Sequence, residues 1–143
     1  PVITTRTEKG LDKAAPKRLE RWRRIGVEAS QQSRRARLPE IADPVKWTAA
    51  LAAGANYRYA LDENESRPLS SAFPAARQND DTVALLVGPE GGWTDDERSR
   101  FTSAGWGPVS LGPSILRAET AALAALAVVS SAWLERAVAT LEL

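Results

Sequence analysis

The chain has 143 residues, 43% of them hydrophobic and 26% charged, which is ordinary for one soluble globular domain. It contains neither cysteine nor histidine. Disulfides, a thiolate nucleophile, cysteine and histidine metal ligands and a histidine general base are therefore excluded. Any chemistry must use carboxylates, hydroxyls, arginine, lysine, backbone groups or a cofactor, and we expect no metal.

The charge is distributed unevenly along the chain, although its net value is only +1. Residues 1–60 carry 13 Lys and Arg against 6 Asp and Glu, or +7, whereas residues 61–143 carry 6 against 12, or −6. A basic half is typical of a surface that faces a polyanion such as nucleic acid. A solvated helix face would give the same pattern, so that alternative stays open.

The sequence predicts no membrane-spanning segment. Its most apolar tract, Thr120 to Leu134, is shorter than the ~20 residues that a spanning helix needs, and it contains Ser130 and Ser131. The first residues do not form the pattern of a signal peptide. We therefore expect a cytoplasmic protein without a membrane partner.

The N-terminal third is predicted to be mainly helical. Pro1–Thr5 indicates the end of a short strand. A helix is expected over Pro16–Arg35, with the proline in its first turn, because apolar residues recur there every three or four positions. These residues are Leu19, Trp22, Ile25 and Ala29. A second helix is expected over Asp43–Ala53, because aspartate followed by proline is typical of a cap and first turn.

Strands and helices alternate in the rest of the chain, which predicts an α/β fold, a mostly parallel sheet with helices on both faces. A run of five apolar residues predicts one strand that is buried on both faces. Thr94 and Glu97 form a capping-box pattern at the start of a helix. The expected elements are strands at Asn56–Leu61, Val83–Val87 and Gly107–Leu111, a helical turn at Leu69–Ala72, and helices at Thr94–Ala104 and Ala118–Leu141.

The apolar run Val83–Val87 ends abruptly at Gly-Pro-Glu-Gly-Gly, residues 88–92. Glycines permit positive φ and close backbone approach, so this loop predicts a ligand site at the carboxyl end of a strand. The loop has neither the P-loop nor the dinucleotide-binding spacing, and Glu90 would repel an anion. A neutral or cationic ligand held by backbone groups is therefore favoured, and a tight βα turn is the alternative.

A second strand end with a Gly-Pro break follows, Leu-Gly-Pro-Ser-Ile-Leu-Arg-Ala-Glu-Thr-Ala at residues 111–121. Together with Gly-Pro-Glu-Gly-Gly-Trp at 88–93, it closely resembles the uridine-N3 methyltransferases of 16S ribosomal RNA, members of the SPOUT superfamily of knotted methyltransferases. Glu20–Trp22 and Glu28–Arg34 match a third block of that family. The chain departs from the family pattern at Ser114, where Arg is common, and at Ala118, where Thr is common.

The resemblance implies a fold and a domain organisation. Residues 1–143 would form a SPOUT methyltransferase domain that corresponds to the family's C-terminal catalytic domain and is incomplete at its N-terminus. A deep trefoil knot would form where residues 111–120 thread through an earlier loop. A PUA-like RNA-binding domain, which is not in this chain, would precede it.

The resemblance also implies the site. S-adenosylmethionine would be the cofactor, with the loop at Glu63 and Asn64 beside it. Arg117 would stabilise the uridine anion or a phosphate, and Glu119 would orient Arg117 or cap its helix. RNA would contact Arg23, Arg34, Arg35 and Arg37. The expected cofactor-binding residues are Leu61, Val87, Gly88, Pro89, Glu90, Gly91, Leu111, Gly112, Ile115, Leu116, Ala118 and Thr120.

The implied reaction is methylation of N3 of a specific uridine in 16S rRNA of the small ribosomal subunit. A homodimer is expected through the last helix, whose small apolar residues are Ala121, Ala122, Ala124, Ala125, Ala127 and Val128. Two other functions stay open. One is an RNA-binding module related to these enzymes but without activity, which the departures at Ser114 and Ala118 favour. The other is a nucleotide-binding α/β domain, which only the glycine loop supports.

Overall fold

The structure is a computed structural model that describes residues 1–6 and 11–139. The chain divides into two compact units, Pro1–Ala50 and Leu51–Leu143. The organisation of residues 1–143 as one methyltransferase domain stays a prediction. No helix among the described residues is long and apolar enough to cross a membrane.

The first unit contains a two-stranded parallel sheet and a long helix. Strand β1 (Val2–Ile3) pairs with β2 (Val45–Lys46), and helix α1 (Leu11–Gln32) lies between them in the sequence. The strand expected at the start of the chain is thus confirmed. The helix begins at Leu11 rather than at Pro16, so the proline lies in its second turn and not, as expected, in its first.

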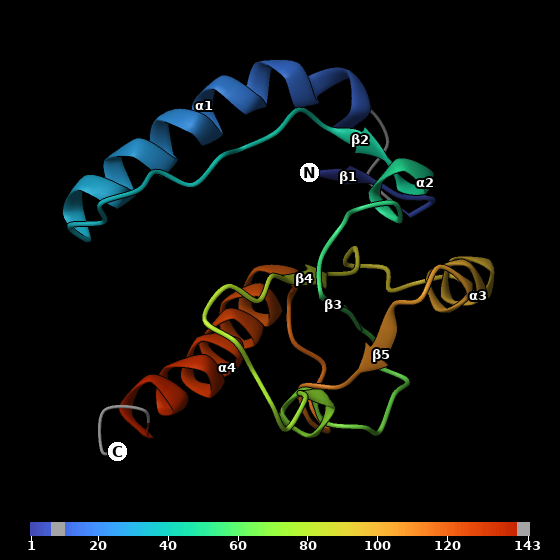
Figure 1. Cartoon of the computed structure of the whole chain (residues 1–143). Helices are drawn as coiled ribbons and strands as arrows, with labels where there is room; N and C mark the ends of the chain where they lie inside the picture. The colour runs from blue at the N-terminus through green and yellow to red at the C-terminus, as the bar shows by residue number, and fades with distance from the viewer. Residues whose placement is uncertain (7–10, 140–143) are drawn as a thin grey trace. The chain divides into compact units, whose positions relative to one another are not determined.

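The second predicted helix, over Asp43–Ala53, is wrong. The chain instead forms β2 and then the single turn of α2 (Trp47–Ala50). The backbone N–H of Val45 donates a hydrogen bond of 3.0 Å to the carbonyl of Pro1, a partner that no local signal reveals. The carboxylate of Asp43 does not cap a helix but accepts a hydrogen bond of 3.0 Å from Arg23 of α1. The segment before β2 runs along α1 (Figure 1).

The second unit is built on three parallel strands in the order β4-β3-β5. These are β3 (Tyr57–Leu61), β4 (Val83–Leu86) and β5 (Gly107–Val109). All three strands were expected, and the α/β fold class with parallel sheets is confirmed. The expectation that the Val83–Val87 run is buried on both faces is wrong, because β4 lies at the edge of this sheet and only Leu86 within it is fully buried.

Helices cover this sheet from both sides, as predicted. Helix α4 (Ala118–Ala139) packs Ala125 into a core with Tyr59, Leu61 and Val109. Helix α3 (Asp95–Ser103) buries Phe101, whose ring meets that of Trp93 edge-on. Figure 1 shows α3 and α4 on opposite sides of the three strands. The trefoil knot stays a prediction.

Local signals located the boundaries of the second unit well. The 3-10 turn η1 spans Leu69–Ala72, as expected. Thr94 caps α3 in a capping box, because its side chain accepts from the N–H of Glu97 and the Glu97 carboxylate accepts from the N–H of Thr94. Helix α4 begins at Ala118, as expected, and its predicted end at Leu141 lies outside the described residues.

Candidate functional site

The carboxyl ends of β3, β4 and β5 meet around a cavity of about 500 Å³. Ligand sites of α/β proteins occur at this edge of a parallel sheet. The volume falls within the ~300–1,000 Å³ range of small-molecule sites. The lining residues come from three loops, namely Leu61–Glu63, then Val87–Glu90 with Gly92 and Trp93, then Ser110–Gly112 with Ser114–Ala118 and Ala121.

The loop after β4 is a tight turn that backbone hydrogen bonding closes. The N–H of Gly92 donates to the carbonyl of Pro89 over 2.8 Å. Gly92 has φ +67°, and a Cβ there would collide with the carboxylate of Glu63. Its positive φ therefore favours glycine, and any side chain there would displace the Glu63 carboxylate.

The indole of Trp93 fixes this loop to the neighbouring strand. Its Nε1 donates a buried hydrogen bond of 2.8 Å to the carbonyl of Leu61, at the end of β3. The ring lies against Gly88, where a Cβ would approach the indole to 3.1 Å. This buried hydrogen bond therefore connects the two loops.

The loop after β3 is held by a partly buried ion pair. Nε of Arg98 lies 2.8 Å from Oδ2 of Asp62, and Nη2 lies 3.2 Å from Oδ1, so the guanidinium donates a hydrogen bond to each carboxylate oxygen. The hydrogen bond to Asp62 is the main reason that the pKa of Arg98 is raised. Oδ1 of Asp62 also accepts from the N–H of Asn64, which closes a turn.

The loop after β5 is held at its first residue, Ser110, and most of the residues beyond it are exposed. The hydroxyl of Ser110, which is buried, accepts from the N–H of Gly112 over 3.1 Å. Beyond it Ile115 and Arg117 are exposed. Among the described residues the side chain of Arg117 forms no ion pair, so its guanidinium is available to a ligand.

The cavity wall is predominantly acidic. Its charged residues are Asp62, Glu63 and Glu90, against the single cation Arg117. Although Asp62 is paired with Arg98, Glu63 and Glu90 are exposed. Such a wall favours a ligand with a positive centre, as the glycine-loop sequence predicted.

Most of the expected cofactor residues lie in this wall. Gly91, Thr120 and Asn64 do not line the cavity; of the two expected catalytic residues Arg117 does and Glu119 does not. The expected residues that line it are Leu61, Val87, Gly88, Pro89, Glu90, Leu111, Gly112, Ile115, Leu116 and Ala118, together with Glu63.

Six further residues in the wall were not among the expected site residues. They are Asp62, Gly92, Trp93, Ser110, Ser114 and Ala121. Gly92 and Trp93 lie within the Gly-Pro-Glu-Gly-Gly-Trp motif at 88–93, and Ser114 and Ala121 lie within the second motif at 111–121. Taking every residue of both motifs as part of the site would therefore have found four of the six. Nothing in the sequence around residue 98 marks Arg98 as the partner of Asp62.

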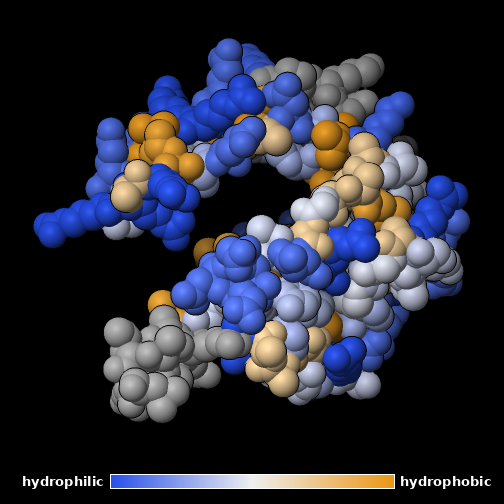
Figure 2. Space-filling model, viewed as in Figure 1, coloured by the Kyte–Doolittle hydropathy of each residue, from blue (hydrophilic) through white to orange (hydrophobic). Residues whose placement is uncertain are grey.

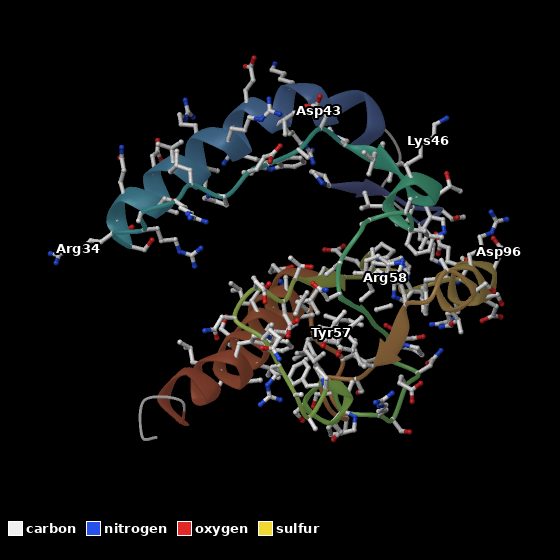
Figure 3. The ribbon with its side chains drawn as sticks, viewed as in Figure 1. Arg34, Asp43, Lys46, Tyr57, Arg58 and Asp96 are labelled. Atoms are coloured by element: carbon white, nitrogen blue, oxygen red, sulfur yellow. The ribbon has the colours of Figure 1, made fainter. Side chains whose placement is uncertain are left out.

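The expected RNA-binding arginines belong to the first unit. Arg23 donates to the carbonyl of Ile41 and pairs with Asp43, so it is partly engaged. The other three, Arg34, Arg35 and Arg37, are exposed at and beyond the end of α1, where Arg34 projects from the helix (Figure 3). Figure 2 shows largely hydrophilic side chains over α1 on the face in view.

The part of the chain that the structure describes contains no group of three or more acidic residues arranged to hold a metal ion. The cavity of the second unit offers a ligand backbone groups, carboxylates and one arginine.

Known proteins resemble the chain in sequence. The chain is 37% identical over 134 residues to ribosomal RNA small subunit methyltransferase E of Synechocystis, covering 92% of this chain and 43% of that protein. The protein of the same name from Bacillus subtilis is 35% identical over 125 residues, covering 83% of this chain and 49% of that protein. The chain thus spans about half the length of the curated relatives it matches.

Solved structures share the fold. A methyltransferase of Legionella pneumophila solved in complex with the cofactor SAM superposes with a TM-score of 0.82 at 34% identity, covering 92% of this chain and 54% of that one. Ribosomal RNA small subunit methyltransferase E of Neisseria gonorrhoeae, bound to S-adenosylmethionine, gives 0.80 at 34% identity, covering 93% and 54%. Since the model of the RNA methyltransferase domain family matches residues 1–130, this chain belongs to that family.

Proposed function

We propose that this chain binds S-adenosylmethionine in the cavity and, as part of its protein, methylates N3 of a specific uridine in 16S rRNA of the small ribosomal subunit. The observation that carries this proposal is the glycine-edged cavity at the carboxyl ends of three parallel strands. Two structural relatives with this fold were solved with S-adenosylmethionine bound, which supports the choice of cofactor.

The residues present fit this cofactor. A cavity of about 500 Å³ has room for a ligand of this size. Gly88 and Gly112 let backbone groups approach the ligand without side chains between them. Glu63 and Glu90 suit a ligand that carries a sulfonium, and no metal or thiol is required.

When bound, S-adenosylmethionine supplies a methyl group that its sulfonium has already activated. The loops after β4 and β5 would hold the cofactor, with Trp93 fixing the first loop in place. The rate gain would come mainly from aligning the methyl group with the uridine, since alignment alone contributes up to ~7–11 kcal/mol in favourable cases.

Arg117 is the residue that we propose acts on the reacting base. It lines the cavity, is exposed, and has no ion-pair partner among the residues that the structure describes. Uridine N3 must lose its proton, and a guanidinium would stabilise the resulting anion. Glu119 lies outside the wall in the first turn of α4, so we assign it to the positive end of that helix rather than to catalysis.

The exposed arginines at the end of α1 are proposed to hold RNA phosphates. Arg34, Arg35 and Arg37 are free of ion pairs within the described residues, whereas Arg23 retains its bond to Asp43. Phosphate contacts by such residues position RNA without reading its sequence. We further propose that the chain acts in the cytoplasm as a homodimer, in a protein that also carries a PUA-like RNA-binding domain.

Methyl transfer to intact small subunits, compared with naked rRNA, tests the proposed reaction, with the modified atom identified by mass spectrometry. In the same assay Arg117→Ala should lower the rate by roughly 100-fold or more, as removal of one transition-state donor commonly does. Its affinity for the cofactor should stay within about threefold, a small change of less than 1.4 kcal/mol. An Arg117 variant that loses cofactor binding but keeps its rate at saturation would refute this role.

A related RNA-binding module without activity is the second candidate. Ser114 and Ala118, where the chain departs from the family pattern, both line the cavity, and this observation favours it. Calorimetry with S-adenosylmethionine separates the two functions, because a module without activity that has lost its cofactor should show no heat of binding.

A further inference from the structure

The wall of the cavity depends on a residue that does not line it. Arg98, in the second turn of α3, reaches the loop after β3 across 36 positions of sequence. Its Nε and Nη2 bind the two oxygens of Asp62 at 2.8 and 3.2 Å. Its Nη1 lies 3.2 Å from Asp95, which fixes the guanidinium from the side of its own helix.

The acceptor, Asp62, is buried and is itself part of the cavity wall. Its N–H donates to the carbonyl of Val109 over 2.9 Å, and its Oδ1 accepts from the N–H of Asn64. Asp62 therefore connects the ends of β3 and β5 with α3. A bidentate guanidinium pair of this kind fixes orientation as well as distance.

Glu63 follows Asp62 in the chain, so the ion pair between Asp62 and Arg98 also fixes the backbone that carries the Glu63 carboxylate. One of its oxygens lies 3.9 Å from Nη2 of Arg98, and its carboxylate lies over Gly92 of the facing loop. Gly92 has no side chain and a φ of +67°, so it leaves the space that the carboxylate occupies. Two independent contacts thus place Glu63 at the cavity.

We propose that Arg98 is a positioning residue, which acts through Asp62 to hold the loop after β3 as a wall of the cofactor cavity and to aim Glu63 at the bound ligand. This inference rests on the proposed binding of S-adenosylmethionine. Arg98 itself does not line the cavity. Its effect should therefore appear in cofactor affinity and not in the rate once the cofactor is bound.

The helix offers a matched control. Arg100 forms a pair of similar length with Asp96, 2.8 Å between Nε and Oδ2, but it is exposed and joins two residues of α3 only. Its side chain is 52% accessible, against 21% for Arg98. Exposed pairs within one helix contribute little to stability, so Arg100→Ala removes an arginine from the same helix without touching the wall.

The test measures the dissociation constants of S-adenosylmethionine and of its demethylated product by calorimetry, at a temperature where circular dichroism shows each variant fully folded. Arg98→Ala should weaken both by about tenfold, equal to 1.4 kcal/mol, with the rate at saturating cofactor within about threefold of the original. Arg98→Lys keeps the positive charge but cannot bind both oxygens of Asp62 as the guanidinium does. Its affinity for both ligands should therefore lie between that of Arg98→Ala and that of the unaltered chain. Arg100→Ala should bind as tightly as the unaltered chain.

Loss of Arg98 leaves a buried carboxylate without its partner, and Arg98→Ala could unfold for that reason. The double variant Asp62→Asn with Arg98→Ala removes the unpaired charge, and it should still bind about tenfold more weakly. A purely structural role would lower the melting temperature but leave the dissociation constants of the folded variants unchanged, and that result would overturn the inference. Absence of binding by the unaltered chain would instead overturn the proposed function.

Discussion

Gly88 lies where the chain leaves β4, directly against the indole ring that holds the loop. A Cβ at this position would lie 3.1 Å from Cε2 of Trp93 and 3.2 Å from Nε1. The ring cannot retreat freely, because Nε1 is bonded to the carbonyl of Leu61. The added methyl group must therefore move either the loop or the ring.

Gly88→Ala should accordingly weaken the binding of S-adenosylmethionine by about tenfold, or 1.4 kcal/mol, because the loop that lines the cavity is displaced. Calorimetry measures this effect. Gly54→Ala is the control, since a Cβ at Gly54 meets nothing within 4 Å. If both variants bind as tightly as the unaltered chain, the loop after β4 does not form the cofactor site.

The carboxylate of Glu65, in the loop after β3, makes the stability of the chain depend on pH. Its Oε1 accepts from the N–H of Arg67 at 3.0 Å and of Ser66 at 2.8 Å. These two bonds, that of Arg67 first, lower the pKa of Glu65 below its ordinary value of 4.5. Because the folded-state pKa is the lower one, the stabilisation is present above pH 4.5 and is lost as the pH falls through the folded value.

The free energy of unfolding of Glu65→Gln should therefore fall less between pH 7 and pH 3.5 than that of the unaltered chain. Urea unfolding at the two pH values measures this difference. The variant should be slightly less stable at pH 7, since an amide oxygen accepts hydrogen bonds more weakly than a carboxylate. Glu40→Gln, at an exposed glutamate of the first unit, serves as the control. Equal pH dependence in the Glu65 variant and the unaltered chain would contradict this account.

At the residue scale, the sequence predicted what short motifs encode. The glycine loop and the segment 111–118 were located from Gly-Pro breaks at strand ends, and most of their residues line the cavity. Asp62 and Arg98 were missed as a pair because 36 positions separate them. Such a contact follows from the sheet and helix arrangement, which the local pattern does not contain.

At the scale of elements, the end of α1 combines a standard backbone motif with an unusual residue. The N–H of Arg35 bonds to the carbonyl of Ser30, and the N–H of Arg34 bonds to that of Gln31, which together form a Schellman motif. Glycine is usual at the left-handed position of this motif, but here Arg34 occupies it with φ 53°. A left-handed residue with a side chain costs ~1–2 kcal/mol.

Arg34→Gly should therefore stabilise the chain by about 0.5–1 kcal/mol in urea unfolding, because glycine relieves the strain but gains entropy when unfolded. The same variant should bind rRNA more weakly, because a phosphate contact is lost. Arg34→Ala separates the two effects, since it removes the charge and retains the strain. Unchanged RNA affinity in both variants would mean that Arg34 does not contact RNA.

The elements that the sequence predicted correctly are those with strong local signals. The capping box at Thr94 placed the start of α3, and the strand expected at Asn56–Leu61 is β3. The prediction failed for Asp43–Ala53, where β2 forms because Val45 pairs with Val2, which is distant in the sequence. It also failed for the burial of β4, because apolar composition does not distinguish a central strand from an edge strand.

For the whole molecule, alternation of strands and helices was sufficient to predict a parallel α/β fold, because parallel strands require a crossover that a helix usually provides. The order β4-β3-β5 was not predictable in this way, since it depends on which strands find each other. The uneven charge similarly predicted a basic region, and the structure places many of its arginines on α1.

For the expected homodimer through helix α4, the structure indicates other interface residues than the sequence did. Ala121, Ala125 and Val128 were expected at a dimer interface, but they pack into the core of their own unit. The apolar residues that α4 leaves exposed are instead Leu123, Leu126 and Leu134, with 70%, 56% and 66% of their surface accessible. Their spacing of three and eight positions puts them on one face of the helix.

We propose that this leucine face joins two copies of the chain, because three exposed leucines on one face of a helix are costly in water. Light scattering at micromolar concentration should then give twice the 15.5 kDa mass of the chain. Leu123→Glu combined with Leu126→Glu should give the single mass, because each buried carboxylate would lack a partner. Ser99→Glu, an exposed position on α3, should leave the mass doubled. A single mass for the unaltered chain would show that the leucine face has another partner or none, and would withdraw the homodimer from the proposed function.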